Sequence, residues 1–111
     1  MARDLALEFH KVAERLDRRR LYRYAEQLRA AGLSLTNNIA EGAGSTHDRE
    51  FKQFLNIARR SLFEDASMIL VFDAMHLLEK AEVENLLQEC DVLSRKILRP
   101  RPYGPLEARI W

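Results

Sequence analysis

The sequence predicts an all-α protein built as an antiparallel, up-and-down four-helix bundle. Two observations carry this prediction. Apolar residues recur at spacings of three and four through four successive segments, as on the buried face of an amphipathic helix. The connections between these segments are short, so consecutive helices are expected to lie side by side and antiparallel. With 111 residues, of which 47% are hydrophobic, the chain can form one domain with its own core.

The first predicted helix runs from Arg3 to Leu16, and the following Asp17-Arg18-Arg19-Arg20, which has no glycine or proline, is either a tight connection or more helix. Asp17 stands at the start of that segment, and we expect it to cap the second helix. The apolar stripe of the first helix has spacings of four, three and four, which place its members on one face. Its members are Leu5, Phe9, Val12 and Leu16.

The second predicted helix begins at Leu21 and ends at Ala40 or Glu41. Gly32 interrupts it, and glycine inside a helix costs about 1 kcal/mol relative to alanine. The interruption therefore indicates a close contact with another helix or a bend. The apolar stripe consists of Leu21, Tyr24, Leu28, Ala31, Leu35 and Ile39.

A junction between the second and third helices is predicted just after Glu41. Gly42 and Gly44 can adopt the left-handed conformation that ends a helix at little cost. Ser45 and Asp48 match the capping-box pattern that begins a helix. One helix is therefore expected to end at the glycines, and the next to begin near Asp48.

The third predicted helix is the longest, from about Asp48 to Leu78. Its main apolar seam consists of Phe51, Leu55, Ala58, Leu62, Ala66 and Ile69. A second apolar face consists of Phe54, Phe63, Leu70 and Leu77. Either two neighbouring helices of the same bundle cover this second face, or it forms a subunit interface.

The fourth predicted helix runs from about Glu82 to Leu98, with Val83, Leu86, Leu87, Cys90, Leu93 and Ile97 on its apolar stripe. Three prolines follow, and they cannot continue a helix but favour an extended chain. We therefore expect the bundle to occupy residues 1–98 and a Pro-rich C-terminal tail to occupy residues 99–111. The final Trp111 either packs on the bundle or on a neighbouring subunit, or belongs to a flexible tail.

Composition predicts a cytoplasmic protein that does not bind a membrane. The single Cys90 cannot form an intramolecular disulfide, which is typical of a reducing compartment. The first residues carry charges where a signal peptide would have an apolar run. No apolar stretch approaches the roughly 20 residues needed to cross a bilayer.

The titratable residues do not form a known catalytic or metal-binding pattern. A di-iron bundle would need Glu-x-x-His on two helices, and the nearest match, Asp73-x-x-His76, has no second copy. Cys90 falls on the apolar stripe of its helix, where a buried and unreactive thiol is usual. No Gly-rich loop follows a strand to hold phosphate. The sequence therefore predicts no enzymatic activity, no metal, no cofactor and no small-molecule substrate.

Arginines are the remaining candidates for a binding site. Arginines at helical spacing can contact successive phosphates of a nucleic acid without reading its sequence. Alternatively, Glu14, Asp17 and Glu26 pair with the same arginines at the protein surface. The candidate nucleic-acid-binding residues are Arg15, Arg18, Arg19, Arg20, Arg23, Arg29, Arg59 and Arg60.

Three segments resemble a known family: Gln27-Leu28-Arg29-Ala30-Ala31, Ser34-x-x-Asn37-Asn38-Ile39-Ala40-Glu41-Gly42-x-Gly44 and Glu50-Phe51-x-x-Phe54-Leu55-Asn56-Ile57-Ala58. They are similar to the four-helix bundle proteins encoded by intervening sequences in bacterial 23S ribosomal RNA genes. The likeness extends roughly from Leu21 to Ile97. We expect the motif residues to be structural, with Asn38 and Glu41 satisfying backbone groups at the helix end and its neighbour. These motif residues are Gln27, Ser34, Asn38, Glu41, Gly42 and Gly44.

The resemblance implies a small cytoplasmic bundle that assembles into a ring-like homopentamer and has no established enzymatic activity. A related branch, the accessory variability determinants of diversity-generating retroelements, implies binding to nucleic acid and to a partner reverse transcriptase. A pentamer would account for the second apolar face of the third helix. The interface residues expected on this basis are Phe54, Phe63, Leu70 and Leu77.

Two functional hypotheses follow from the sequence. The first is a non-enzymatic homo-oligomer, with a pentamer favoured, that serves as a scaffold or accessory protein and binds RNA or DNA through its arginines. The second is a protein-protein interaction adaptor that docks through its off-seam apolar residues and Pro-rich tail and binds no nucleic acid.

Overall fold

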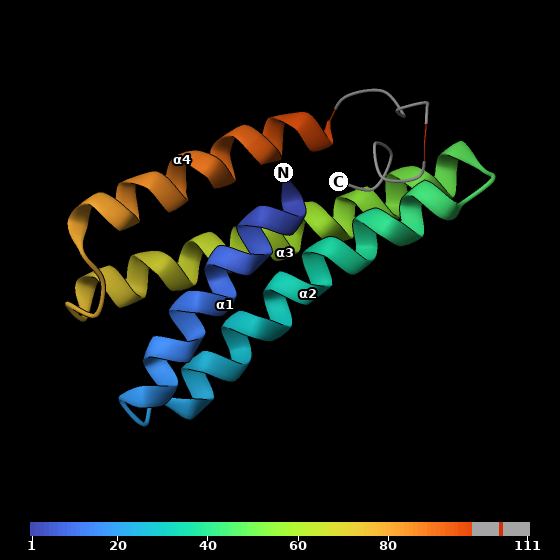
Figure 1. Ribbon diagram of the computed structural model, residues 1–111. Coiled ribbons are helices and arrows are strands. Elements are labelled where there is room, and N and C mark those ends of the chain that lie inside the picture. Colours follow the sequence, from blue (N-terminus) through green and yellow to red (C-terminus); the bar gives the residue numbers. More distant parts are fainter. Residues whose placement is uncertain (99–104, 106–111) are drawn as a thin grey trace.

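A computed structural model describes residues 1–98 and Pro105. Within these residues the chain forms four α-helices, and successive helices run antiparallel (Figure 1). The helices are α1 (Ala2–Arg18), α2 (Tyr22–Gly44), α3 (Asp48–Ala74) and α4 (Lys80–Ile97). The predicted all-α four-helix bundle is confirmed. The remainder of the predicted Pro-rich tail, including Trp111, lies outside the described residues.

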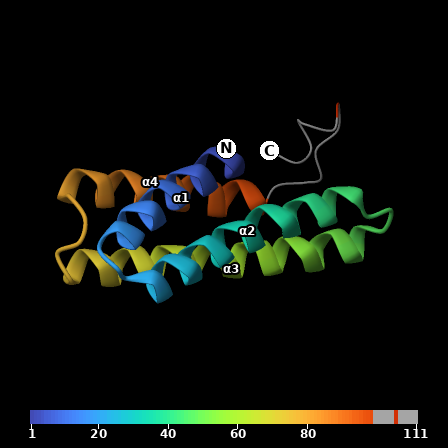
Figure 2. The same ribbon diagram turned by 60° about the horizontal axis from the view of Figure 1, so that its bottom comes forward.

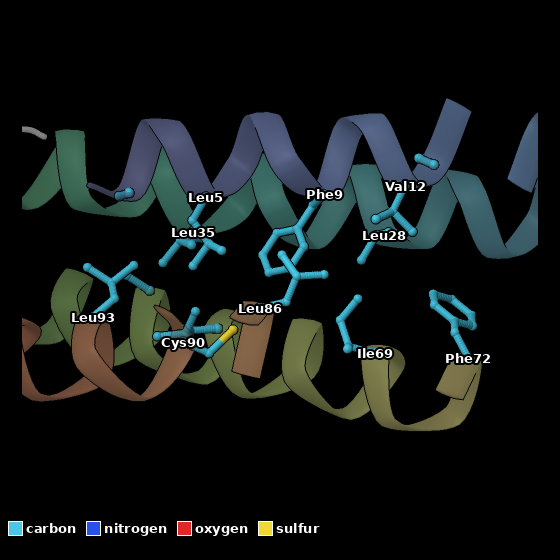
Figure 3. Packing of buried hydrophobic residues seen from close by; sticks show 14 of the residues in the cluster. Leu5, Phe9, Val12, Leu28, Leu35, Ile69, Phe72, Leu86, Cys90 and Leu93 are labelled. Atoms are coloured by element: carbon cyan, nitrogen blue, oxygen red, sulfur yellow. The ribbon is translucent and has the colours of Figure 1, made fainter. Parts of the chain in front are cut away.

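The core lies between all four helices. In Figure 3, apolar side chains of α1 and α2 point toward those of α3 and α4 across the centre of the bundle. Burying one such side chain fully contributes roughly 1.5–3 kcal/mol. All four residues predicted for the apolar stripe of α1 are buried. The labelled core residues are Leu5, Phe9, Val12, Leu28, Leu35, Ile69, Phe72, Leu86, Cys90 and Leu93.

The helices α2 and α3 form the longest pair of the bundle. They contain 23 and 27 residues, whereas α1 and α4 contain 17 and 18. Figure 2 shows α2 and α3 side by side, with their shared end extending beyond the N-terminal end of α1. Gly32 of α2 is buried, and a Cβ there would lie 3.7 Å from Cδ2 of Phe9. Of the two alternatives for Gly32, the structure thus shows a contact with α1.

The connection from α1 to α2 differs from the prediction. Arg19 is the C-cap of α1, and Arg20 adopts a left-handed conformation with φ of 63°. The backbone N–H of Arg20 donates to the carbonyl of Asp17 at 2.9 Å, and the N–H of Leu21 donates to the carbonyl of Leu16 at 2.9 Å. This is the Schellman arrangement of a helix end. Asp17 therefore lies inside α1 and does not cap α2, whose N-cap is Leu21.

The connection from α3 to α4 repeats this geometry. The third helix was predicted to extend to Leu78, but α3 ends at Ala74, and α4 begins at Lys80. His76 takes the left-handed position with φ of 59°. The same pair of backbone hydrogen bonds closes the helix, from the N–H of His76 to the carbonyl of Asp73 at 2.9 Å and from the N–H of Leu77 to the carbonyl of Phe72 at 3.0 Å.

The second helix ends at the second of the two glycines, but the predicted end at Ala40 or Glu41 and the predicted left-handed glycine conformation are wrong. The helix α2 continues to Gly44, and its C-cap Ser45 has an extended backbone. Gly42 is buried inside the helix, and a Cβ there would lie 3.2 Å from Cβ of Phe54 and 3.3 Å from the carbonyl oxygen of Phe51. Gly42 thus allows α3 to approach α2 closely, and this packing role explains a glycine inside a helix.

The capping box predicted at Ser45 and Asp48 is also wrong. The N-cap of α3 is His47, which makes no side-chain capping hydrogen bond. The hydroxyl of Ser45 instead accepts a hydrogen bond from the backbone N–H of His47 at 3.2 Å. Ser45 therefore stabilises the turn that precedes α3, as serine commonly does in connections.

Candidate functional site

Four of the eight predicted arginines gather at the connection between α1 and α2. Arg18 ends α1, Arg19 and Arg20 form the connection, and Arg23 lies in the first turn of α2. All four side chains are exposed. The Schellman connection keeps them together, because it reverses the chain within very few residues. We call these four residues the arginine turn.

Asp17 beside this connection and Glu82 of α4 each pair with an arginine outside the arginine turn. The Arg29 guanidinium donates to the carboxylate of Asp17. This hydrogen bond is the main cause that raises the pKa of Arg29. The guanidinium of Arg15 reaches across to α4 and donates to Glu82 at 2.6 Å. Two of the eight predicted arginines therefore serve as ion-pair partners within the bundle.

The remaining predicted acidic partners do not pair with the arginine turn. Glu14 lies 2.9 Å from Nε2 of His10. Glu26 is exposed and forms no salt bridge within residues 1–98. The four guanidinium groups of the arginine turn thus form no ion pair in the described part of the chain. An arginine stays charged at every physiological pH, so the turn presents four positive charges to solvent.

Arg59 and Arg60 lie apart from the arginine turn. The ring of Tyr24 in α2 contacts that of Phe72 in α3, which places the start of α2 beside the end of α3. Arg60 precedes Phe72 by 12 residues, or about 18 Å along the helix axis. The guanidinium of Arg59 stacks over the ring of Phe63 at 4.9 Å. The structure therefore does not bring these two arginines into the same surface.

The four residues predicted for assembly on the third helix divide into two pairs, and Leu77 lies beyond the end of α3. Phe63 and Leu70 are 54% and 53% exposed. Phe54 is half-buried and lies against Gly42. Leu77 packs against the core of its own chain. Of the four predicted residues, Phe63 and Leu70 are thus the two that expose a substantial apolar surface.

Besides Phe63 and Leu70, α3 carries another exposed apolar surface that was not predicted from the sequence. Ile57, Val71 and Met75 are exposed large hydrophobic residues, and Met68, one turn before Val71, is half-buried. Residues 68, 71 and 75 have the spacing of three and four that places them on one side of a helix. The spacing of these apolar residues can be read from the sequence. We call these four residues the α3 stripe.

A surface groove of about 490 Å³ runs between α1 and α2. Leu7, Gly32 and Leu33 line this groove. Both leucines are exposed, whereas Gly32 is buried. Neither leucine belongs to the apolar stripes predicted from the sequence. The basic residues along the groove are Arg3, His10 and Arg29, and each lies within salt-bridge distance of an acidic residue.

The motif residues join α2 to α3. The hydroxyl oxygens of Ser34 and Ser61 lie 2.8 Å apart across the two helices. The amide of Asn38 donates to the carbonyl of Ser34 at 2.7 Å, inside α2 and not at the helix end as predicted. Gln27 and Glu41 are exposed. The structural role expected for the motif therefore rests on Ser34, Asn38 and Gly42.

Asp65 is a buried acid that sequence analysis did not single out. Its side chain is 0% exposed, and neither carboxyl oxygen has a hydrogen-bond partner among the described residues. Burial, with a smaller contribution from Glu64, raises the pKa of Asp65 to about 8. Burial also raises the pKa of the Cys90 thiol to about 12, with further contributions from Asp65 and Glu89. Cys90 is buried as predicted, and its thiol stays protonated and unreactive at neutral pH.

Neither a metal-binding cluster nor a membrane-spanning helix occurs among the residues that the structure describes. No group of three or more His, Cys, Asp or Glu side chains within them is placed to hold a metal ion. None of their helices combines the length and the apolar character needed to cross a membrane.

Comparison with known proteins adds the family. The model of the 23S rRNA-intervening sequence protein family matches residues 1–99. The chain belongs to this family. The match covers all four helices of this intervening sequence protein and confirms the resemblance carried by the motif segments. No curated protein and no solved structure shows a significant match.

Membership of the intervening sequence protein family is consistent with a small non-enzymatic protein. The relation to the accessory variability determinants of retroelements stays a prediction, as does the partner reverse transcriptase.

Proposed function

We propose that this intervening sequence protein is a non-enzymatic, cytoplasmic scaffold that assembles into a homo-oligomer, with a pentamer favoured. In this proposal it binds RNA or DNA through the arginine turn. The observation that carries the proposal is the absence of ion pairs at Arg18, Arg19, Arg20 and Arg23 within the described residues. Asp17 and Glu82 take Arg29 and Arg15 as partners.

Unpaired arginines at one turn suit a phosphate backbone. Each guanidinium that contacts a phosphate releases counterions from the nucleic acid, and this release supplies most of the affinity of non-specific binding. Phosphates accept bidentate hydrogen bonds from a guanidinium, which gives arginine better geometry than lysine. Because Arg15 and Arg29 are already paired, the proposal assigns the phosphate contacts to the four residues of the arginine turn.

Assembly is supported by apolar surface on different helices. The α3 stripe and the exposed pair Phe63 and Leu70 lie on α3, whereas the groove with Leu7 and Leu33 lies between α1 and α2. A ring needs two different surfaces on each copy, one for each neighbour, whereas a two-fold dimer needs only one. Separate apolar surfaces therefore favour a closed ring such as a pentamer.

The nucleic-acid role is tested by charge removal at two places. The arginine-turn variant carries Arg18→Ala, Arg19→Ala and Arg20→Ala. The matched control carries Arg49→Ala, Lys52→Ala and Lys96→Ala, which removes the same charge from exposed residues elsewhere. We expect the arginine-turn variant to lose about tenfold or more in affinity for labelled RNA at low salt. Equal losses in both variants would show that net charge, not the arginine turn, governs binding.

Assembly is tested by sedimentation velocity across a range of protein concentrations. A pentamer is the expected main species. A stable single-chain species at micromolar concentration would contradict the proposed assembly. Replacing Val71 and Met75 of the α3 stripe with serine removes apolar area from this stripe. If the stripe lies between subunits, the double variant should sediment as smaller oligomers than the wild type.

The exposed α3 stripe also favours a second candidate function, a protein-protein interaction adaptor. Apolar residues exposed along several turns of one helix are typical of protein contact surfaces. Purification from the native cell with and without nuclease separates the two functions. A protein partner that stays bound after nuclease treatment supports the adaptor, whereas a partner lost with the nucleic acid supports the first proposal.

A further inference from the structure

Two tyrosines alternate with the arginines at the start of α2, and they have different surroundings. Tyr22 is the first residue of α2 and is 57% exposed, and its ring takes part in no aromatic contact within the described residues. Tyr24 is 40% exposed, and its ring centroid lies 5.8 Å from that of Phe72. Tyr24 is thus held by the bundle, whereas Tyr22 presents its ring to solvent.

Tyr22 lies within four residues of each arginine of the arginine turn along the chain. Arg20 lies two residues before it and Arg23 follows it directly, so the ring and the charges share one short connection. Arginine alone contacts the phosphates of single-stranded and duplex nucleic acid alike. An exposed ring adds a surface for stacking, and only unpaired bases offer their faces to it.

We propose that the arginine turn binds single-stranded nucleic acid, with the ring of Tyr22 stacked on an unpaired base and the arginines on the flanking phosphates. This proposal rests on the proposed function and narrows its substrate class. Duplex RNA keeps its bases stacked inside the helix, so it can use the arginines but not the ring. The preference for single strands therefore depends on Tyr22, and the salt dependence depends on the arginines.

The test compares three labelled probes of about 12 nucleotides, a length that spans a typical single-strand site. They are a single-stranded RNA, the DNA of the same sequence and the corresponding RNA duplex. Tyr22→Ala removes the ring, and alanine suits the helix, so the variant should fold. Tyr22→Phe is the matched control, because it keeps the ring and removes only the hydroxyl.

We expect Tyr22→Ala to weaken binding of single strands by roughly 5-fold to 100-fold, and to leave binding of the duplex unchanged. Tyr22→Phe should bind like the wild type. A probe carrying 2-aminopurine reports stacking directly, since its fluorescence is quenched when it stacks. The quenching should be present in the wild type and in Tyr22→Phe and absent in Tyr22→Ala. The ratio of RNA to DNA affinity then identifies which single strand is preferred.

The failure of this inference can be told apart from the failure of the proposed function. If Tyr22→Ala binds single strands as tightly as the wild type while the arginine-turn variant loses affinity, the stacking role is wrong and phosphate binding stands. Equal affinity of the wild type for single strands and for the duplex would also overturn the inference alone. If no probe binds at low salt, the proposed nucleic-acid function fails and takes this inference with it.

Discussion

The arginine turn and the middle of α3 hold unpaired ionisable groups in opposite surroundings. Four guanidinium groups lie in water, whereas the carboxyl of Asp65 is 0% exposed and has no hydrogen-bond partner among the described residues. Water solvates an unpaired charge, but a protein interior penalises it heavily. An unpaired charge thus persists at the surface, where a ligand can use it, whereas burial drives the group toward its neutral form.

The largest effect on the free energy of unfolding is expected at Asp65. Its pKa is raised from 3.8 to about 8 by burial, so the folded protein holds a proton that the unfolded chain releases. Stability contributed by this proton is fully present below about pH 4 and is lost as the pH rises toward about 8. The loss is at most about 1.4 kcal/mol per pH unit, or several kcal/mol in all. Asp65→Leu should remove this loss.

The measurement is urea unfolding of the wild type and Asp65→Leu between about pH 5 and about pH 9, at one protein concentration. The variant should gain stability relative to the wild type as the pH rises. Asp65→Asn is the control, since it abolishes the titration but keeps a buried polar group. A difference between wild type and Asp65→Leu that does not change with pH would show that the carboxyl does not titrate in this range.

The next effect concerns the two buried glycines of α2. A Cβ at Gly42 would lie 3.2 Å from Cβ of Phe54 and 3.3 Å from a backbone oxygen, whereas a Cβ at Gly32 would meet only Phe9 at 3.7 Å. Gly42→Ala should therefore destabilise the bundle by about 1–2 kcal/mol despite the better helix propensity of alanine. Gly32→Ala should stabilise it by about 0.5–1 kcal/mol. Thermal unfolding of both variants checks the contrast, and stabilisation by both would disprove close packing at Gly42.

An effect on stability of similar size to that at Gly32 is expected at the two left-handed residues. Arg20 and His76 both occupy the position that glycine favours at a helix end. Arg20→Gly and His76→Gly should each stabilise the protein by about 1 kcal/mol, because glycine avoids the cost of a left-handed side-chain-bearing residue. Only Arg20→Gly should also weaken RNA binding. Equal RNA affinity in the two variants would remove Arg20 from the phosphate-binding surface.

The fold could be predicted from the sequence because apolar spacing reports the buried face of each helix directly. Leu5, Phe9, Val12 and Leu16 of α1 are all buried, as their spacing indicated. The helix ends were harder, because Arg20 and His76 adopt conformations usually associated with glycine. The glycine at position 42 is needed for packing against Phe54, and this requirement depends on a neighbouring helix that local sequence does not show.

The candidate site could be predicted only as a set of arginines. Which of them remain unpaired depends on contacts across the bundle, and the pair Arg15 and Glu82 joins residues 67 positions apart. Asp65 shows a different difficulty. It occupies a core position of α3 between Leu62 and Ile69. A sequence pattern assigns such a position to an apolar residue, so the apolar spacing predicts Ala66 at this place in the seam.

Phosphate contact by the arginine turn is tested most directly by the salt dependence of RNA affinity. The logarithm of the affinity should fall linearly with the logarithm of salt concentration in the wild type. The variant with Arg18, Arg19 and Arg20 replaced by alanine should lose about 2–3 from that slope, at roughly 0.7–0.9 for each phosphate contact removed. The control with Arg49, Lys52 and Lys96 replaced should keep the wild-type slope. Binding that does not depend on salt, or an unchanged slope in the arginine-turn variant, would contradict the account.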